Sequence, residues 1–361
     1  MRAAVMRAVG EPLEIEDVPV SKPGPHEVLI RTAACGVCHS DLHILEGAYP
    51  HGTPTVLGHE AAGIVEAVGS EVRYVRPGDH VITCLSAFCG ECEFCLTGRM
   101  SLCDSPDLVR GECEEPRLGA AEAPMHQFVG LSGFAEMMLV HEHALVKVRE
   151  DMPLDRAALI GCAVTTGVGA VVNTARVAPG ETVAVIGCGG VGLSAVNGAA
   201  IAGAGRIIAI DTVAEKRELA RAFGATDTVD PADGDVVKQV RALTDGGVHH
   251  ALEAIGLKAT VEDAFRMVRR GGAATVIGMI PVGTRIELHG ADFLREKRIQ
   301  GSMMGSNRFR VDMPRYVELY MQGRLKLDEL ISQRIRLDDV NAALAALEDG
   351  GVARSVIMFD A

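Results

Sequence analysis

Hydrophobic and polar positions follow two different rhythms along the chain. In residues 1–80, short runs rich in Val and Ile, such as Glu27–Ala33 and Gly63–Val68, lie between Pro-Gly turns. Short apolar runs bounded by turn residues are typical of strands. This part therefore predicts an all-β, barrel-like unit. Residues 84–130 contain Cys, Gly and Pro throughout and predict a long functional loop with little regular structure.

Near residue 164 the rhythm changes, because short apolar runs begin to alternate with helical segments. The expected strands are Thr182–Ile186, Arg206–Ile210, Thr228–Val229, His249–Ala254 and Ala273–Ile277. An Ala-rich helix follows the first strand, and further helices are expected at Ala214–Gly224, Asp235–Leu243 and Lys258–Val268. This alternation predicts a parallel sheet with helices on both faces. Beyond residue 304 the chain returns to helices and a final strand, Ser355–Phe359.

Composition narrows the class of protein. The 361 residues are 48% hydrophobic and 23% charged, which is typical of a globular chain of about two domains. The formal net charge of −13 disfavours a nucleic-acid or anionic-membrane partner. Thr182–Gly205 carries no charge and is long enough to span a bilayer, but its seven glycines favour a strand–turn–helix instead. Charged residues interrupt the amino terminus, so we expect no signal peptide and a cytoplasmic protein.

Four of the ten cysteines form the strongest local signal. Cys89, Cys92, Cys95 and Cys103 have the spacing C-x2-C-x2-C-x7-C. Four thiolates in one short segment suit a structural, tetrahedral zinc ion. An iron–sulfur cluster is the second interpretation, although no Pro follows the fourth Cys. Free or disulfide-bonded cysteines remain a further alternative. Glu91 and Glu93 between the ligands argue against a nucleic-acid-binding zinc ribbon.

A glycine-rich motif predicts a dinucleotide site. Gly187, Gly189, Gly190 and Gly192 form G-x-G-x-x-G between the expected strand Thr182–Ile186 and a helix. In that context the backbone can approach a pyrophosphate at a helix amino terminus. Asp211 ends the next strand, 19 residues after Gly192. A carboxylate there accepts from ribose hydroxyls and repels a 2′-phosphate, which favours NAD over NADP. A tight turn with a capping Asp is the alternative.

Three further segments are ordinary when taken singly. They contain Cys38, the pair His59-Glu60, and Cys162, and buried Cys or a structural His would explain each of them. Together with the motifs above, however, Gly58-His59-Glu60-x2-Gly63-x5-Gly69-x2-Val72 resembles the signature of the zinc-dependent medium-chain alcohol dehydrogenase family. The similarity extends over residues 1–361. The long segment between Cys103 and Cys162 resembles the animal-type and glutathione-dependent formaldehyde dehydrogenase branches.

The resemblance implies an α/β fold of two domains. A GroES-like, β-rich catalytic domain would comprise residues 1–163 and 305–361, around an inserted, doubly wound Rossmann domain at 164–304. A homodimer is expected through the Rossmann sheet edge near Ala274–Met279 and Gly301–Gly305, with a tetramer as the alternative.

The resemblance also implies a catalytic zinc, the second of two per chain, held by Cys38, His59 and Cys162. Three protein ligands leave one position open for substrate. Ser40 would take the alcohol proton and His43 would pass it to solvent, while Glu60 would lie behind the metal. A turn residue, a surface residue and a structural salt bridge are the respective alternatives.

Further residues are implied for cofactor and substrate. His39 and Arg354 would contact the pyrophosphate and Lys216 the adenosine ribose, although a solvated charge is nearly as good an interpretation of Lys216. Thr166 and Val191 would pack on the nicotinamide ring. Leu85, Phe128, Val129 and Met304 fall at pocket positions, and their apolar side chains favour medium, bulky or aromatic alcohols.

Three other functions remain open. A thiol-dependent formaldehyde dehydrogenase acting on an S-hydroxymethyl adduct is the main alternative. In the glutathione-dependent branch a basic anchor follows the last loop cysteine, whereas Asp104 and Asp107 stand here, which disfavours glutathione but not another thiol carrier. A polyol dehydrogenase and a non-enzymatic dinucleotide-binding protein are weaker alternatives. The cysteines at 35, 84, 113 and 188 are interpreted as packing residues or free thiols.

Overall fold

The chain divides into two compact units. The computed structural model describes residues 1–111, 114–348 and 353–360, so Cys113 lies outside the described residues. The first unit consists of Met1–Cys162, Arg308–Met321 and Leu327–Ala361, and the second of Ala163–Asn307 and Gln322–Lys326. The sequence does not indicate the return of 322–326 to the second unit. Asn197 accounts for it, because its side chain accepts from the Lys326 N–H at 3.0 Å.

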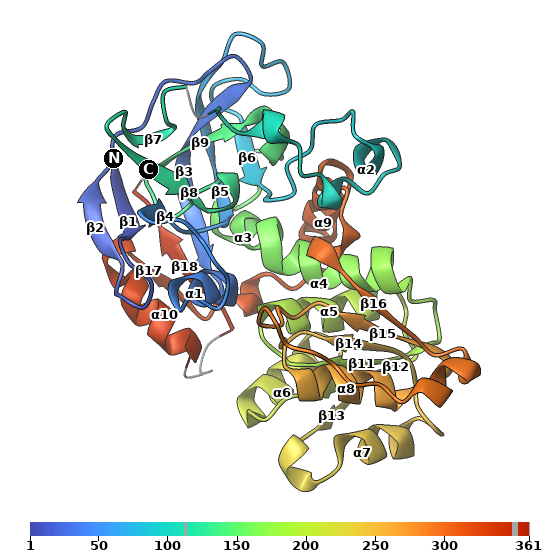
Figure 1. The fold of residues 1–361 in the computed structure, drawn as a ribbon. Helices are drawn as coiled ribbons and strands as arrows, with labels where there is room; N and C mark the ends of the chain where they lie inside the picture. The colour runs from blue at the N-terminus through green and yellow to red at the C-terminus, as the bar shows by residue number, and fades with distance from the viewer. Residues whose placement is uncertain (112–113, 349–352, 361) are drawn as a thin grey trace. The chain divides into compact units, whose positions relative to one another are not determined.

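Two sheets form the first unit (Figure 1). One has the order β2-β1-β4-β8-β7, with β1 Arg2–Met6, β2 Glu14–Asp17, β4 Thr55–Val56, β7 Leu118–Ala120 and β8 Ala123–Gln127. The other has the order β10-β6-β5-β3-β18-β17, and β9 also pairs with β3. Its strands are β3 Glu27–Val37, β5 Glu60–Val68, β6 His80–Thr83, β9 Met137–His141, β10 Leu145–Lys147, β17 Gln333–Ile335 and β18 Ser355–Met358.

The long strand β3 organises this unit. Along β3 buried and partly exposed residues alternate before the last four residues, which are all buried. Its alternating Val28 and Ile30 belong to the main apolar core of the unit. Because β3 and β5 are antiparallel and pair Gly36 with Glu60, the end of β3 lies beside the start of β5. A side chain at Gly36 would come within 2.4 Å of the Glu60 carboxylate, so only glycine fits there.

The interval 84–130 contains more regular structure than the sequence predicts. It includes the short helix α2 (Glu93–Leu96), three 3-10 turns and the hairpin of β7 and β8. Strand β8 pairs in parallel with β4, with Thr55 opposite His126. The partner strand lies about seventy residues away, and no local pattern reveals such pairing. The remaining helices of the unit are α1 His39–Leu45, α3 Leu154–Leu159, α9 Phe309–Met321 and α10 Val340–Glu348.

The second unit is a parallel sheet of order β13-β12-β11-β14-β15-β16 (Figure 1). Its strands are β11 Thr182–Ile186, β12 Arg206–Ile210, β13 Asp227–Val229, β14 Val248–Glu253, β15 Val268–Val276 and β16 Arg298–Gly301. The helices are α4 Thr165–Gly169, α5 Gly190–Ile201, α6 Ala214–Ala222, α7 Val236–Leu243 and α8 Lys258–Met267. The order reverses between β11 and β14, which is the doubly wound topology that the alternating pattern predicts.

One helical stretch is long and apolar enough to cross a membrane. It is Leu154–Ala175, and 83% of its apolar window is buried within the protein. Burial of this extent is typical of the core helix of a globular protein. A π-turn at Ile160–Val164 interrupts it and carries Cys162. Such turns occur often at functional sites.

Candidate functional site

The four cysteines of the loop converge on one point in the first unit. The Sγ atoms of Cys89, Cys92, Cys95 and Cys103 lie within 4.8 Å of one another. The Sγ atoms of Cys89 and Cys95 are 3.9 Å apart. A tetrahedron with Zn–S bonds of about 2.3 Å has edges of roughly 3.8 Å. The four-cysteine cluster therefore fits a zinc ion closely.

Backbone donors prepare the sulfurs of Cys89 and Cys92 to carry negative charge. The N–H groups of Glu91 and Cys92 point at the Cys89 sulfur at 3.4 and 3.3 Å, and the Cys95 N–H points at the Cys92 sulfur at 3.5 Å. The bonds from Glu91 and Cys92 lower the pKa of Cys89 to about 6. A thiolate is the form that binds metal.

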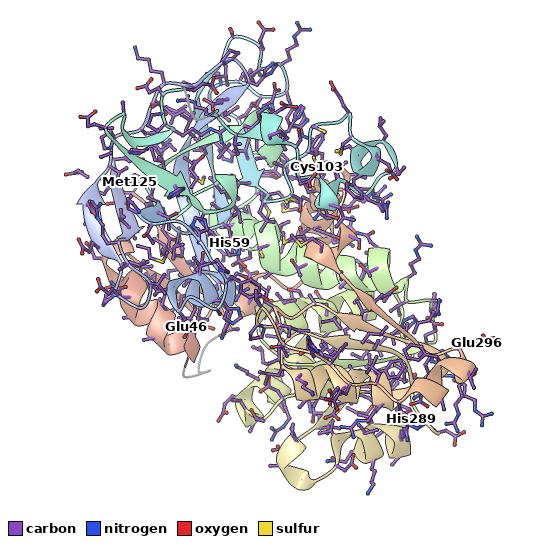
Figure 2. All side chains as sticks on the ribbon, viewed as in Figure 1. Glu46, His59, Cys103, Met125, His289 and Glu296 are labelled. Atoms are coloured by element: carbon purple, nitrogen blue, oxygen red, sulfur yellow. The ribbon has the colours of Figure 1, made fainter. Side chains whose placement is uncertain are left out.

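The second cluster comes from three distant segments. Cys38, His59, Glu60 and Cys162 each place a ligand atom within 4.8 Å of the others, and all four are buried. Cys38 follows β3 and caps helix α1, His59 precedes β5, and Cys162 lies on the π-turn. Figure 2 labels one residue of each cluster, His59 here and Cys103 in the four-cysteine cluster. The structure thus brings together the three residues predicted as ligands.

Orphaned polar atoms at this second cluster fit a metal ion. The His59 Nε2 atom is buried and has no hydrogen-bond partner. Two thiols and one imidazole form a common zinc ligand set that leaves a fourth position open. The hydrogen bond with Cys162 and the charges of Arg354 and His59 lower the pKa of Cys38 well below its ordinary value, although burial opposes them.

Asp41 is a residue of this site that the sequence analysis missed. Its carboxylate is fully buried and accepts from the His59 Nδ1–H at 3.1 Å, from the Gly58 N–H at 3.0 Å and from the Cys38 N–H at 3.1 Å. The bond from His59 Nδ1 fixes the tautomer in which His59 Nε2 carries the lone pair that a metal requires. The only signal in the sequence is its position three residues after Cys38.

Arg354 contacts two residues of the second cluster. Its NH2 group donates to Glu60 Oε1 at 3.0 Å and to the Cys38 sulfur at 3.4 Å, and the residue is only 2% exposed. In this position it balances the charge of the metal cluster, and its contact with a pyrophosphate stays a prediction. Burial raises the pKa of Glu60 to about 7, although the charge of Arg354 opposes the shift.

Helix α1 holds Ser40 and His43, which the resemblance implies near the catalytic metal, and His39, which it implies at the pyrophosphate. Ser40 Oγ lies 3.7 Å from the Cys38 sulfur. His43 follows one turn later, and its ring stacks on Tyr49 with 6.3 Å between centroids. The Nδ1 atom of His43 is buried and has no hydrogen-bond partner. His39 is exposed at the start of the helix, as a phosphate contact requires.

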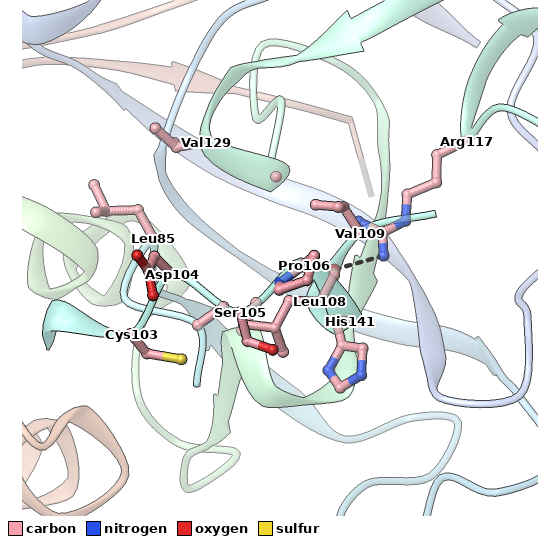
Figure 3. Close-up of a pocket in the computed structure, with 13 residues that line it drawn as sticks. Leu85, Cys103, Asp104, Ser105, Pro106, Leu108, Val109, Arg117, Val129 and His141 are labelled. Atoms are coloured by element: carbon pink, nitrogen blue, oxygen red, sulfur yellow. Dashed lines mark hydrogen bonds between the residues drawn. The ribbon is translucent and has the colours of Figure 1, made fainter. Parts of the chain in front are cut away.

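A cavity of about 310 Å³ lies in the first unit (Figure 3). Leu85 and Val129, two of the predicted pocket residues, line it. The other residues that line the cavity, apolar and polar, were not predicted as pocket residues, because they come together only in the folded chain. These include Ala87, Leu108, Val109, Asp104, Arg117 and His141.

Phe128 and Val129 connect this cavity with the metal cluster. Among the described residues, Phe128 does not line the cavity, because its ring packs edge-on against His59 with 5.4 Å between centroids. Val129 has a φ of 46°, a left-handed conformation that β-branched residues rarely adopt. The strained conformation turns the Val129 side chain to the cavity, while the neighbouring Phe128 covers the metal ligand His59.

In the second unit the glycine-rich motif forms the turn between β11 and α5. Gly187 has a φ of 91°, and a Cβ at Gly192 would lie 1.7 Å from the Gly187 carbonyl oxygen. Glycine is therefore required at both positions. A Cβ at Gly189 would meet no protein atom within 4 Å, so this side of the turn offers room for a phosphate at the start of α5.

Asp211 lies at the end of β12, beside the glycine-rich turn. Its carboxylate accepts from the Cys188 N–H at 2.7 Å and the Val213 N–H at 2.9 Å. These bonds hold the side chain in place and leave lone pairs for ribose hydroxyls. Lys216 is half-buried on α6, close enough to oppose the rise that burial causes in the pKa of the Cys188 thiol.

The residues implied at the nicotinamide ring are neighbours in the second unit. A Cβ at Gly167 would lie 2.3 Å from the Val191 carbonyl oxygen, so the turn after Thr166 touches the start of α5. The Thr166 hydroxyl donates to the Met304 sulfur at 3.2 Å. Met304 has a φ of 48°, so the second unit also carries a strained residue at an implied pocket position.

Comparisons with known proteins agree with this arrangement. Residues 24–150 match the family described as alcohol dehydrogenase GroES-like domain, and residues 190–320 match the family described as zinc-binding dehydrogenase. The S-(hydroxymethyl)glutathione dehydrogenase of Escherichia coli O1:K1 is 41% identical, over 99% of each chain. The crystal structure of benzyl alcohol dehydrogenase from Acinetobacter calcoaceticus superimposes with a TM-score of 0.93, 32% identity and 99% coverage of each chain. A zinc-binding dehydrogenase from Sinorhizobium meliloti 1021 in complex with NADP has a TM-score of 0.85, 32% identity and the same coverage.

The chain therefore belongs to the zinc-binding alcohol dehydrogenase family, as the motifs predict. It is an oxidoreductase that acts on an alcohol or aldehyde with zinc and a nicotinamide dinucleotide. The predicted combination of a GroES-like and a Rossmann domain is confirmed.

Proposed function

We propose that this enzyme oxidises apolar primary or secondary alcohols, of medium length or aromatic, to aldehydes or ketones and reduces NAD. The supporting observation is the cavity whose lining includes the apolar residues Leu85, Leu108, Val109 and Val129. Val129 follows Phe128 in the chain, and the Phe128 ring packs on the metal ligand His59. An apolar lining binds alcohols in proportion to their buried surface and discriminates weakly per methylene.

Each residue near the metal has a distinct task in this proposal. Zinc at Cys38, His59 and Cys162 would act as a Lewis acid that acidifies the alcohol, and NAD would accept the hydride. Ser40 would take the alcohol proton as it passes its own to the nicotinamide ribose, and His43 would deliver the proton to solvent. Asp41 orients His59, and Arg354 with Glu60 balances the charge of the two thiolates.

For the cofactor, we infer NAD rather than NADP. The carboxylate of Asp211 lies beside the glycine-rich turn, held by the Cys188 and Val213 N–H groups. A fixed negative charge there favours two ribose hydroxyls over a 2′-phosphate. Lys216, on the next helix, would contact the same ribose, and His39 and Arg354 the pyrophosphate.

A second candidate is oxidation of an S-hydroxymethyl thiol adduct. The Escherichia coli relative, which is 41% identical over nearly the full length, carries the name of that activity and favours it. Against glutathione as the carrier, Asp104 lines the cavity as a carboxylate, and Arg117 is engaged by a carboxylate of the protein. The carboxylates of such an adduct would therefore find no available cation in the cavity.

One experiment separates the two candidates. NADH formation is followed at 340 nm with ethanol, 1-hexanol and benzyl alcohol, and with formaldehyde in the presence and absence of glutathione. The proposal expects kcat/KM to rise from ethanol to hexanol or benzyl alcohol, with no thiol requirement. Turnover of formaldehyde that depends on glutathione, with flat values for the alcohols, would reject it.

We also propose a cytoplasmic homodimer that meets only small molecules as partners. Strand β16 is the exposed edge of the sheet in the second unit, and Val282, Phe293 and Leu294 nearby are between 48% and 89% exposed. Apolar residues clustered at a sheet edge are typical of an interface. Sedimentation equilibrium measures the state directly, and a monomeric mass would reject the dimer.

A further inference from the structure

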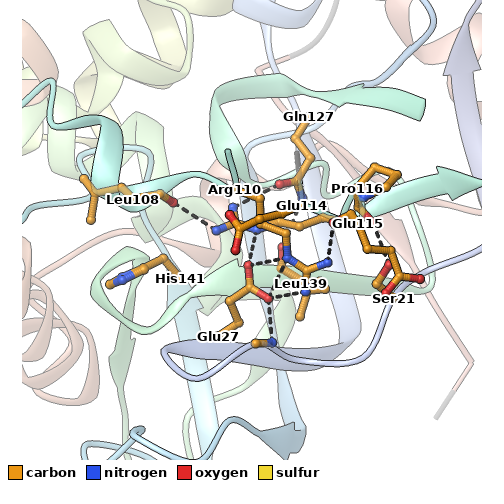
Figure 4. A network of polar contacts seen from close by, with 12 residues as sticks. Ser21, Glu27, Leu108, Arg110, Glu114, Glu115, Pro116, Gln127, Leu139 and His141 are labelled. Carbon is orange, nitrogen blue, oxygen red and sulfur yellow. Dashed lines mark hydrogen bonds and ion pairs between the residues drawn. The ribbon is translucent and has the colours of Figure 1, made fainter. Parts of the chain in front are cut away.

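Glu27, at the start of β3, is a buried carboxylate that receives two arginines (Figure 4). Its Oε1 atom accepts from Arg117 Nε at 2.6 Å and from Arg110 Nε at 3.0 Å, and its Oε2 atom accepts from the Gly24 N–H at 2.8 Å. Burial raises the pKa of Glu27, but the bonds from Arg110, Gly24 and Arg117 outweigh it and leave the pKa below its ordinary value. Glu27 is therefore ionised at neutral pH.

Arg117 is the member of this group that reaches the cavity. It lines the cavity, yet each of its nitrogen groups has a protein partner. Besides the Nε bond to Glu27, NH1 donates to Gln127 Oε1 at 3.2 Å and NH2 donates to the Leu108 carbonyl at 3.0 Å. The guanidinium is 6% exposed. The positive charge of Arg117 is thus neutralised within the protein and is not available to a ligand.

The same bonds shape the wall of the cavity. Arg117 fixes the backbone at Leu108, and Leu108 and Val109 both line the cavity. Arg110 donates to the Glu115 carbonyl at 2.7 Å and to the Lys22 carbonyl, outside this segment, at 2.8 Å. Leu108 and Glu115 are therefore both held by arginines that bind one carboxylate on β3.

Besides Arg117, the titratable residues that line this cavity are Cys103, a ligand of the four-cysteine cluster, Asp104 and His141. His141 is neutral at physiological pH, because burial lowers its pKa to about 4. Asp104 contributes a negative charge. Among the described lining residues, Arg117 is the only Lys or Arg, so the sign of the cavity depends on whether Glu27 neutralises it.

From these contacts we infer that Glu27 is a positioning residue that sets the charge selectivity of the substrate cavity. By engaging Arg117 it keeps the cavity free of an available cation and holds Leu108 and Val109 as an apolar wall. The enzyme therefore selects substrates with a neutral distal end over those with a carboxylate. This inference rests on the proposed function, because it takes the cavity as the site of the alcohol's distal end.

The test compares two alcohols of equal length, 1-hexanol and 6-hydroxyhexanoate. In Glu27→Gln, Arg117 keeps its charge without a counter-ion, and the ratio of kcat/KM for 6-hydroxyhexanoate to that for 1-hexanol should rise by roughly tenfold. Glu27→Gln/Arg117→Gln should return the ratio to the wild-type value. A purely structural role of Glu27 would lower both values together and leave the ratio unchanged, and that result overturns the inference.

Glu114→Gln is the matched control. Glu114 lies in the same segment and accepts from the Gly111 N–H, with no contact to either arginine. The variant makes the same change in net charge, and its ratio should equal that of the wild type. An equal rise in Glu114→Gln and Glu27→Gln would show a general charge effect and reject the specific role of Glu27.

Two measurements keep the outcome decisive. If Glu27→Gln does not fold, as judged by thermal unfolding and zinc content, Arg117→Gln alone is compared with the wild type. An unchanged ratio of kcat/KM for 6-hydroxyhexanoate to that for 1-hexanol supports neutralisation of Arg117 by Glu27. A fall in this ratio rejects it. If the wild-type enzyme does not oxidise 1-hexanol, the proposed function fails by itself. The relative affinities for hexanoate and hexanamide, measured by titration calorimetry in wild type and Glu27→Gln, then test the inference without turnover.

Discussion

The two cysteine clusters of the first unit differ in how they are built. The four-cysteine cluster comes from 15 consecutive residues, from Cys89 to Cys103, and backbone N–H groups of the same loop point at its sulfurs. The other cluster joins Cys38, His59 and Cys162 from three segments, and a buried carboxylate orients its histidine. The four-cysteine cluster offers four thiolates, which fill the coordination sphere of a metal. The other cluster offers three ligands and leaves a fourth position open for the reaction. A closed local site stabilises its loop, and an open site made of distant segments suits catalysis.

The largest effect is expected from His59→Ala. Loss of an imidazole ligand removes the catalytic metal, and Lewis-acid activation is worth several kcal/mol, so kcat should fall by roughly a thousandfold or more. Elemental analysis should find one zinc fewer per chain, with the four-cysteine cluster still loaded. Full activity in His59→Ala would contradict the assignment of the open site.

Asp41→Asn should have the next largest effect. Without the carboxylate, His59 loses the partner that fixes its ring, and metal affinity or activity should fall by roughly 10- to 100-fold. Asp107→Asn is a control, because Asp107 is exposed and bonds only to Ser105. Zinc titration with a chelator measures the affinity. Equal behaviour of the two variants would remove Asp41 from the site.

Asp211→Asn tests a second locally encoded site, the glycine-rich turn of the second unit. The substitution keeps the shape and removes the charge that disfavours a 2′-phosphate, so the ratio of kcat/KM with NADP to that with NAD should rise by about tenfold. Asp227→Asn, at the opposite end of the neighbouring strand beside Arg206, should leave the ratio unchanged. A fall in the ratio would mean that Asp211 does not contact the ribose.

The smallest effect on turnover is expected from Cys95→Ser, which sharpens the contrast with His59→Ala. Loss of the zinc at the four-cysteine cluster should lower the unfolding temperature by at least about 4 °C, because structural zinc contributes folding energy. Turnover per chain that retains the catalytic zinc should stay within about twofold of the wild type. Lost turnover at an unchanged unfolding temperature, measured by calorimetry, would mean that the roles of the two clusters are reversed.

Locally encoded features could be predicted well from the sequence. Strands Thr182–Ile186 and Arg206–Ile210 have the predicted bounds, since buried parallel strands are short apolar runs. The glycine-rich turn and the four-cysteine loop depend on spacing within one segment. Strand β16 and the hairpin of β7 and β8 were not predicted, because β16 and β8 are mostly exposed and contain no buried apolar run.

The candidate site divides in the same way. The ligands Cys38, His59 and Cys162 were named through a resemblance, and their proximity follows from the antiparallel pairing of β3 with β5 and from the π-turn. Asp41 and the role of Glu27 have no signature, because each acts through partners that only the folded chain supplies.

By itself, the sequence determined the family and the parallel sheet, and it indicated the four-cysteine loop and the glycine-rich turn. The tertiary structure decided which partner each buried charge receives. Arg354 is directed to Glu60 and Cys38, and Arg117 to Glu27, in both cases by contacts between residues more than eighty positions apart. The position of a residue along the chain is encoded locally, but the electrostatic partner of its side chain depends on burial and on long-range packing. These two factors fix which charge is neutralised and which can act.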